Sequence, residues 1–254
     1  SESEYKLHVL NKQAVALYSG SPGRAKELAE MYQCALANKP LRLATATTRL
    51  RGPLSAIKRR LAEHYIGARL GVSYREFKKH GPSWYGALEF SKRLSAIERH
   101  DLNVDMVIAG FVDGQPVLYQ TVKEDDGGRA LQRQTNFCMV GTGTYTAEPA
   151  LHARGHVFTT TLAQALYNIY EAKRIGESSP SVGTKTRMLV LRVPERGSQS
   201  VRVQKLTPAG EKWLRGLFGR YGQRRIKKWI HLPQDALETG RSLTSPISFS
   251  TDHT

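Results

Sequence analysis

The stretch that decides the fold is KLHVLNKQAVALYSG, residues 6–20. Its two halves, residues 6–10 and 14–18, are rich in strand-forming side chains, and the turn pair Asn11-Lys12 separates them. The second half is apolar at nearly every position, which is typical of a strand buried on both faces. The stretch therefore predicts an interior β-hairpin that ends in the Gly/Pro-rich residues 19–23.

Outward from this hairpin, patterns of helical and strand period alternate in blocks. The helical patterns cover residues 25–36, 53–70, 83–100, 161–172 and a segment that starts at Thr207-Pro208. The strand patterns cover residues 105–112, 116–122, 134–140, 186–193 and 201–205. Helices that are segregated from antiparallel hairpins in this way predict an α+β fold with layered packing.

The chain reads as one domain over residues 1–231, because no linker or internal repeat divides it. Residues 232–254 are rich in Ser, Thr and Pro, and they predict a C-terminal tail or an arm on a neighbouring subunit. No run of apolar residues is long enough for a membrane span, so we expect no membrane contact. Two cysteines, Cys34 and Cys138, cannot form a disulfide framework, and this favours a reducing, cytoplasmic location.

The chain is strongly basic, with a formal net charge of +16. One basic cluster covers residues 205–228 and a second covers residues 49–60. Such clusters attract polyanions, but they are also found on solvated faces and on surfaces that dock on acidic subunits. No nucleic-acid-binding motif accompanies them, so polyanion contact stays one of three interpretations.

Five short motifs follow one another in a particular order. KLHVL (6–10) comes first, Gly20 stands fourteen positions after Lys6, and IAGFVD (108–113), VGTGT (140–144) and SSPSVG (178–183) follow. In order and spacing they resemble the proteasome β-type subunits, which are N-terminal-nucleophile (Ntn) hydrolases. The resemblance covers about residues 6–193, and it implies the four-layer αββα sandwich of that family and assembly into a ring-like homo- or hetero-oligomer.

The resemblance implies a catalytic role for Lys6, Gly20, Thr142 and Ser181. An Ntn hydrolase attacks an amide with the side chain of its first residue, whose α-amine is the base. Lys6 would favour the deprotonated nucleophile by its charge, and the Gly20 N–H would donate to the oxyanion. Thr142 and Ser181 match the family's serines around the N-terminal amine. The implied activity is that of a threonine-type peptidase or amidohydrolase, and no cofactor is implied.

The start of the chain departs from the family pattern. The family places a nucleophile strand and a second strand before the lysine strand, whereas residues 1–5 span at most roughly 18 Å here. Ser1 is a permitted nucleophile in the wrong position. Ser178 stands where the family has an aspartate, and Glu177 is a candidate replacement. The sequence thus predicts an N-terminally incomplete scaffold, active if the nucleophile strand is present or supplied by another chain.

Two alternatives to an enzyme stay open: a non-catalytic assembly subunit of the same fold, and a polyanion (nucleic acid) binding module that uses residues 205–228. Other patterns predict structure rather than chemistry. His152 and His156 have ligand spacing, but no third ligand stands beside them, so no metal site is expected. The cysteines are expected to be small buried hydrophobes. The aromatic cluster of Trp84, Tyr85 and Phe90 predicts core packing or a subunit contact.

Overall fold

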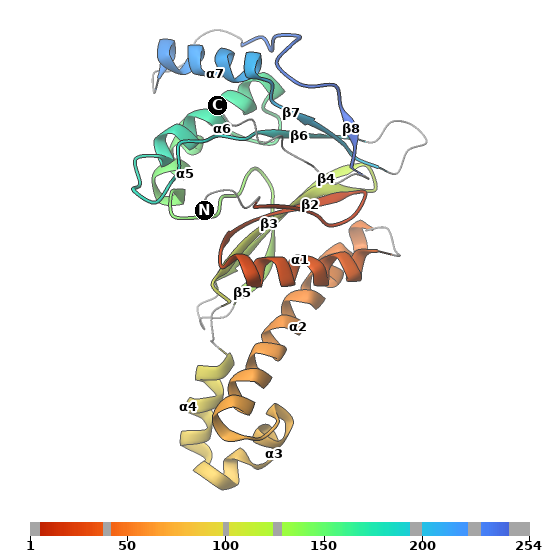
Figure 1. The fold of residues 1–254 in the computed structure, drawn as a ribbon, viewed down its shortest axis with the longest axis vertical. Coiled ribbons are helices and arrows are strands. Elements are labelled where there is room, and N and C mark those ends of the chain that lie inside the picture. The colour runs from red at the N-terminus through yellow and green to blue at the C-terminus, as the bar shows by residue number, and fades with distance from the viewer. Residues whose placement is uncertain are drawn as a thin grey trace.

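The computed structural model describes residues 6–37, 42–98, 102–123, 129–193, 200–222 and 230–243. These residues form seven helices and two antiparallel sheets, which confirms the α+β prediction (Figure 1). The strands are β1 (Leu7–Val9), β2 (Ala14–Gly20), β3 (Val104–Val112), β4 (Gln115–Lys123), β5 (Arg129–Gln134), β6 (Leu189–Arg192), β7 (Arg202–Lys205) and β8 (Arg241–Ser242). The helices are α1 (Pro22–Leu36), α2 (Leu43–Leu70), α3 (Tyr74–Tyr85), α4 (Ala87–Glu98), α5 (Thr144–Ala153), α6 (Leu162–Gly176) and α7 (Pro208–Tyr221).

The predicted hairpin is present as β1 and β2, at one side of a five-stranded sheet of order β1-β2-β3-β4-β5. Its turn forms because Asn11 Oδ1 accepts hydrogen bonds from the N–H groups of Gln13 and Ala14, at 2.8 and 2.9 Å. Val15 and Ala16 point to opposite faces of the sheet, and both are buried. The expectation of a strand buried on both faces is confirmed.

The second predicted hairpin, β3 and β4, is also confirmed. Its turn residues Asp113 and Gly114 have φ angles of 51° and 74°, and positive φ at both central positions suits the tight turn of a hairpin. Asp113 has a further contact, because its Oδ2 accepts the N–H of Leu43 at 2.9 Å. This carboxylate therefore caps the first turn of α2, where it also complements the helix dipole.

Two hydrophobic cores cover the two faces of the larger sheet. On one face, α1 and the first half of α2 pack on β2 and its neighbours, with Tyr18, Tyr32 and Leu54 buried there. On the other face, Val15 packs with Val203 of the three-stranded sheet β6-β7-β8. Helices α6 and α7 pack on the far side of the smaller sheet, as Figure 1 shows.

Helices α2, α3 and α4 form what we call the helical arm, which projects from the body in Figure 1. Its root is in the main core through Leu50 and Ile57, whereas Ala62 and Ile66 are buried in a separate core with α3 and α4. Each half of α2 therefore buries a different side. No helix in the described ranges is both long and apolar enough to cross a membrane, and this includes α2.

The boundaries of the arm differ from the prediction. Helix α2 begins ten residues before Pro53, which is buried inside the helix. The single helix predicted over residues 83–100 is wrong, because α3 ends and α4 begins around Gly86, with φ of 76°. The aromatic cluster separates accordingly: Tyr85 and Phe90 pack in the core of the arm, while Trp84 remains 49% exposed.

Two further segments differ from the prediction. The strand predicted over residues 134–140 ends at Gln134, and the Met139 carbonyl accepts the side-chain amide of Gln120 at 2.8 Å instead of a ladder hydrogen bond. Residues 232–243, predicted as a tail or an arm on a neighbour, lie against the body. Within them Leu243 is buried and β8 pairs with β7. Residues 244–254 of the predicted tail are outside the described residues.

A buried ion pair joins α5 to α6 and to the end of α7. The Arg154 guanidinium donates to both carboxylate oxygens of Glu171, at 2.5 and 2.7 Å, and the side chains are only 10% and 2% exposed. The carbonyl of Gly222 accepts from Arg154 and from the Tyr167 hydroxyl. The Glu171 carboxylate holds the pKa of the Arg154 guanidinium above its usual value. Both charges are compensated only while the pair is intact.

We predict that Glu171→Ala destabilises the fold by about 3–5 kcal/mol, because it leaves the Arg154 charge buried without its partner. Glu89→Ala is the control, since it removes the exposed pair with Arg93 and costs roughly 0.5 kcal/mol or less. Urea unfolding of the two variants and the wild type measures both free energies. Equal losses would contradict the distinction between the buried and the exposed pair.

Candidate functional site

Lys6 and Gly20 lie at the same end of the first hairpin. The N–H of Tyr18 donates to the Lys6 carbonyl at 3.1 Å, and Gly20 follows two residues later on β2. The Lys6 residue itself is exposed. The hairpin therefore brings the lysine and the glycine to the same end, with Gly20 two residues beyond the position opposite Lys6, although fourteen positions separate them along the chain.

The alternation of the sheet directs the Gly20 N–H. The N–H of Ser21 donates to Asn103, on the β3 side, whereas the N–H of Tyr18 donates to β1. The N–H groups along a strand point alternately to its two neighbours. Gly20 is two residues after Tyr18, so its N–H also points away from β3, toward the side of Lys6. Its φ of 98° and a carbonyl of Asn103 only 2.2 Å from where a Cβ would stand require glycine at this position.

Thr142 and Ser181 are brought into direct contact. Ser181 Oγ donates to Thr142 Oγ1 at 2.8 Å, from segments that are 39 residues apart. Thr142 stands in the turn before α5, and Ser181 follows α6. The two helices approach closely at this end because Gly143 and Gly176 have no side chains; a Cβ on Gly143 would lie 3.2 Å from the Gly176 carbonyl.

A contact that the sequence did not predict joins these two pairs. Gly141, with φ of 108°, lies against Ser19, whose Oγ would be 3.2 Å from a Cβ at position 141. Gly141 precedes Thr142, and Ser19 precedes Gly20. The structure therefore gathers Lys6, Gly20, Thr142 and Ser181 at one end of β1 and β2. The only signal of this contact in the sequence is the glycine in the VGTGT motif.

The same end of the sheet leaves apolar surface open. Leu17 points to the same face as Val15 and pairs with Leu7 of β1. Val15 is 2% exposed beneath the smaller sheet, whereas Leu17 is 41% exposed. The smaller sheet thus covers the far end of the hairpin and leaves the end beside Gly20 uncovered.

Glu177, the candidate replacement for the family's aspartate, has other partners. Its carboxylate accepts from Lys173 Nζ at 2.7 Å and pairs with Arg174 at 2.5 Å, and its side chain is 8% exposed. Lys173 also donates to the Gly183 carbonyl at 2.6 Å. Glu177 therefore anchors the loop that carries Ser181 to α6, which is a positioning role rather than a contact with Thr142.

The cysteines and histidines give no second site. Burial raises the pKa of the Cys138 thiol to about 12, so this thiol stays protonated at neutral pH. Cys34 is exposed, so the expectation that it is buried is wrong. The described residues contain no group of three or more His, Cys, Asp or Glu side chains arranged to hold a metal ion. His152 and His156 instead pack their rings against Phe137.

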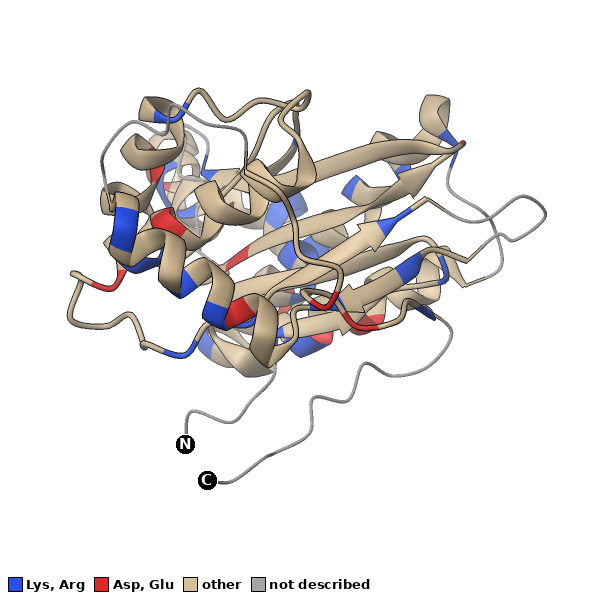
Figure 2. Cartoon of the chain, turned by 90° about the horizontal axis from the view of Figure 1, so that it is seen from above, with Lys and Arg blue, Asp and Glu red and all other residues tan. Residues whose placement is uncertain are grey.

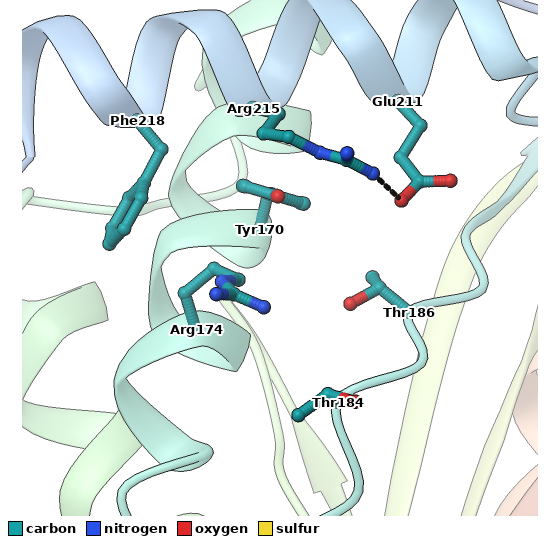
Figure 3. Close-up of a pocket in the computed structure, with 7 residues that line it drawn as sticks. All are labelled: Tyr170, Arg174, Thr184, Thr186, Glu211, Arg215 and Phe218. Atoms are coloured by element: carbon teal, nitrogen blue, oxygen red, sulfur yellow. Dashed lines mark hydrogen bonds and ion pairs between the residues drawn. The ribbon is translucent and has the colours of Figure 1, made fainter.

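A pocket of about 370 Å³ opens between α6, α7 and the segment after Gly183 (Figure 3). None of the four predicted site residues lines it. Its two guanidinium groups already have carboxylate partners, Arg174 with Glu177 and Arg215 with Glu211. Their charge is therefore largely compensated, and the pocket carries no argument for an anion site. It is lined by Tyr170, Arg174, Thr184, Thr186, Glu211, Arg215 and Phe218.

A scan against protein-family models gives no match to the chain, and a search of the curated proteins gives none either. The chemistry of the site is therefore inferred from the positions of its residues. These positions combine a cationic side chain, a backbone N–H directed toward it and a pair of bonded hydroxyls at one end of a sheet. An acyl-transfer site has the same ingredients once a nucleophile is added.

We predict that Gly20→Ala destabilises the protein more than Gly114→Ala. Both glycines have positive φ, so each alanine costs about 1–2 kcal/mol of backbone strain. Only position 20 adds a collision, because its Cβ would meet the Asn103 carbonyl, whereas nothing lies within 4 Å of a Cβ at Gly114. Urea unfolding measures the difference. Equal losses of unfolding free energy in the two variants would show that the Asn103 carbonyl does not lie close to Gly20.

We predict that His156 makes the stability depend on pH. Burial lowers the pKa of this imidazole, so between its folded value and about 6.5 the unfolded chain binds a proton that the folded chain does not. The contribution of neutral His156 to the free energy of unfolding is therefore fully present above about pH 6.5 and falls as the pH decreases below this value. Melting temperatures at pH 7.5 and 5.5 should differ less in His156→Gln than in the wild type. His64→Gln, on the exposed side of α2, should keep the wild-type difference.

Proposed function

We propose that the chain is a proteasome-like Ntn hydrolase scaffold, a four-layer αββα sandwich that hydrolyses peptide or amide bonds when a nucleophile strand is present or supplied by another chain. The observation that carries the proposal is the hydrogen bond between Ser181 and Thr142, at the end of the sheet where Lys6 and Gly20 lie. The order of cores supports the sandwich, since helices, larger sheet, smaller sheet and helices pack in that sequence.

Each of the four residues has a role in such a reaction. The Lys6 ammonium lowers the pKa of a nearby nucleophile by its charge. The Gly20 N–H donates to the oxyanion of the tetrahedral intermediate, and a donor of this kind is worth about 2.7–4 kcal/mol of barrier. The hydroxyls of Thr142 and Ser181 orient the α-amine that accepts the proton of the nucleophile. Glu177 holds the Ser181 loop in place through Lys173.

The open apolar surface is where the nucleophile strand fits. A strand laid over Leu17 would bury this side chain, which is 41% exposed. Burying a leucine is favourable by about 1.5–3 kcal/mol when it is complete. The same strand would have its first residue near Lys6 and Gly20. A reducing, cytoplasmic compartment suits the protein, because Cys34 is exposed as a free thiol.

The test uses the longest product of the gene, with its N-terminal residue identified from the intact mass. We expect it to cleave fluorogenic peptides and to be labelled by a threonine-directed epoxyketone. Lys6→Ala should abolish both signals, because the nucleophile then loses the charge that favours its deprotonated form. Lys12→Ala is the matched control, since Lys12 is an exposed lysine in the turn of the same hairpin and should leave both signals unchanged.

The enzymatic proposal would be wrong if a product with a Thr, Ser or Cys N-terminus showed no labelling and no turnover. Equal losses in Lys6→Ala and Lys12→Ala would remove the assigned role of Lys6. Circular dichroism of both variants excludes unfolding as the cause of a loss.

A non-catalytic assembly subunit of the same fold is the second candidate. It is favoured by large apolar side chains exposed on α5, before α6 and on α6: Tyr145 at 89%, Phe158 at 79% and Ile169 at 46%. Such side chains are typical of surfaces that contact another subunit. Light scattering should then show a large homo- or hetero-oligomer without peptide turnover. A strictly monomeric species in dilute solution would contradict this candidate.

A further inference from the structure

The helical arm carries much of the excess positive charge. Residues 43–98 contain eleven lysines and arginines against four glutamates, a net charge of +7 out of the +16 of the whole chain. Figure 2 shows Lys and Arg positions on many elements and few Asp and Glu positions between them. A basic excess of this size on one projecting unit predicts attraction to a polyanion.

All four glutamates of the arm have partners within it. Glu63 accepts the N–H of Tyr74, and Glu76 caps α3 through Ser73. Glu89 pairs with Arg93, and Glu98 accepts from Tyr74 and pairs with Lys78. These contacts stabilise the arm itself, and Glu89 and Glu98 each form an ion pair with one cation of the arm.

Seven cations of the arm form no ion pair with an acid in the described part of the chain. They are Arg51, Lys58, Arg59, Arg69, Arg75, Lys79 and Lys92. All except Lys58, which is partly buried, are exposed. Their charge therefore faces solvent, where it is free to act on a ligand.

The unpaired cations on α2 lie outside the side of the helix that the body covers. Leu50, Leu54 and Ile57 bury one side of this helix in the main core. At about 100° per residue, Arg59 lies opposite this buried side, and Arg51 lies about 90° from it, on one flank of the helix. The helix has 28 residues and is about 42 Å long, so its cations form an extended track rather than a compact cluster.

Aromatic rings accompany this charge. Trp84 is 49% exposed, and its indole stacks on the His80 ring with centroids 5.8 Å apart. The Arg69 guanidinium lies 4.4 Å from the centre of the Tyr65 ring. An exposed indole on a unit that also carries unpaired cations is the combination with which proteins bind the bases and phosphates of a single strand.

We propose that the helical arm binds single-stranded nucleic acid, with phosphates along Arg51 and Arg59 of α2 and a base stacked on Trp84. A protein partner fits less well, because interface cores are apolar and depleted in lysine. Large apolar side chains on the arm are exposed only at Leu43, Leu70, Trp84 and Leu88 among its described positions. The basic cluster of residues 205–228 gives weaker support for nucleic-acid binding than the arm does. Its Arg215 is paired with Glu211, and residues 223–229 lie outside the described part of the chain.

The test measures fluorescence anisotropy of a labelled twenty-nucleotide oligothymidylate with the full chain, between 50 and 300 mM salt. Affinity should fall linearly in a log–log plot against salt. The double variant Arg51→Gln/Arg59→Gln should reduce the slope by about 1.4 and weaken binding about tenfold or more at 0.1 M salt. Trp84→Ala should weaken binding at least about fivefold, whereas Trp84→Phe should retain most of the affinity.

The matched control is Lys212→Gln/Arg220→Gln on α7. It removes the same charge from two exposed residues eight positions apart on one helix, as the arm variant does. The control should bind as the wild type does. Equal effects of the two double variants would overturn the proposal, because only net charge would then matter. Tighter binding to duplex DNA, to polyglutamate or to phosphatidylserine vesicles than to the oligonucleotide would also overturn it.

Discussion

Strand β2 is confined on both of its faces, and the rest of the structure depends on this constraint. Helices α1 and α2 cover one face through Ala16 and Tyr18, and the smaller sheet covers the other through Val15. A polar side chain at any of these positions would be buried without an assured partner, which is costly. The strand is therefore apolar until its last residues, where Ser19 and Gly20 reach the open end of the sheet.

That open end is where we propose that the functional site lies. The backbone of Gly20 lies so close to the Asn103 carbonyl that no side chain fits at this position. Its N–H points toward the side of Lys6 and not toward β3. Ser19 then touches Gly141, which brings the Thr142–Ser181 pair to the same place. Packing of small residues thus fixes the positions of polar groups that lie far apart in the sequence, and Leu17 beside them remains 41% exposed.

Local chemistry explains which parts of the fold could be predicted. The turns at Asn11 and at Asp113-Gly114 are encoded by the side chain or the φ preference of the turn residue itself. The helix starts at Thr161 and Thr207 are encoded by side-chain caps. The contact between Thr142 and Ser181 has no such local signal, because it depends on the close packing of α5 on α6. The resemblance to Ntn hydrolases implies only that both residues surround one N-terminal amine, and it does not predict their direct hydrogen bond.

The failures of prediction have tertiary causes. Pro53 normally marks a helix start, but here the packing of Leu50 and Leu54 in one core carries the helix through it. Residues 232–243 look like a tail in composition, yet β7 offers β8 an edge to pair with. In the arm, α2 extends over 28 residues because its first half packs in the main core and its second half packs in the core of the arm. Its root is fixed by Asp113 at the N-terminus and by Arg60 to Glu27 of α1, at 2.8 Å. Helix α2 and strand β2 therefore share one core, so the root of the arm and the strand that carries Gly20 belong to the same packed unit.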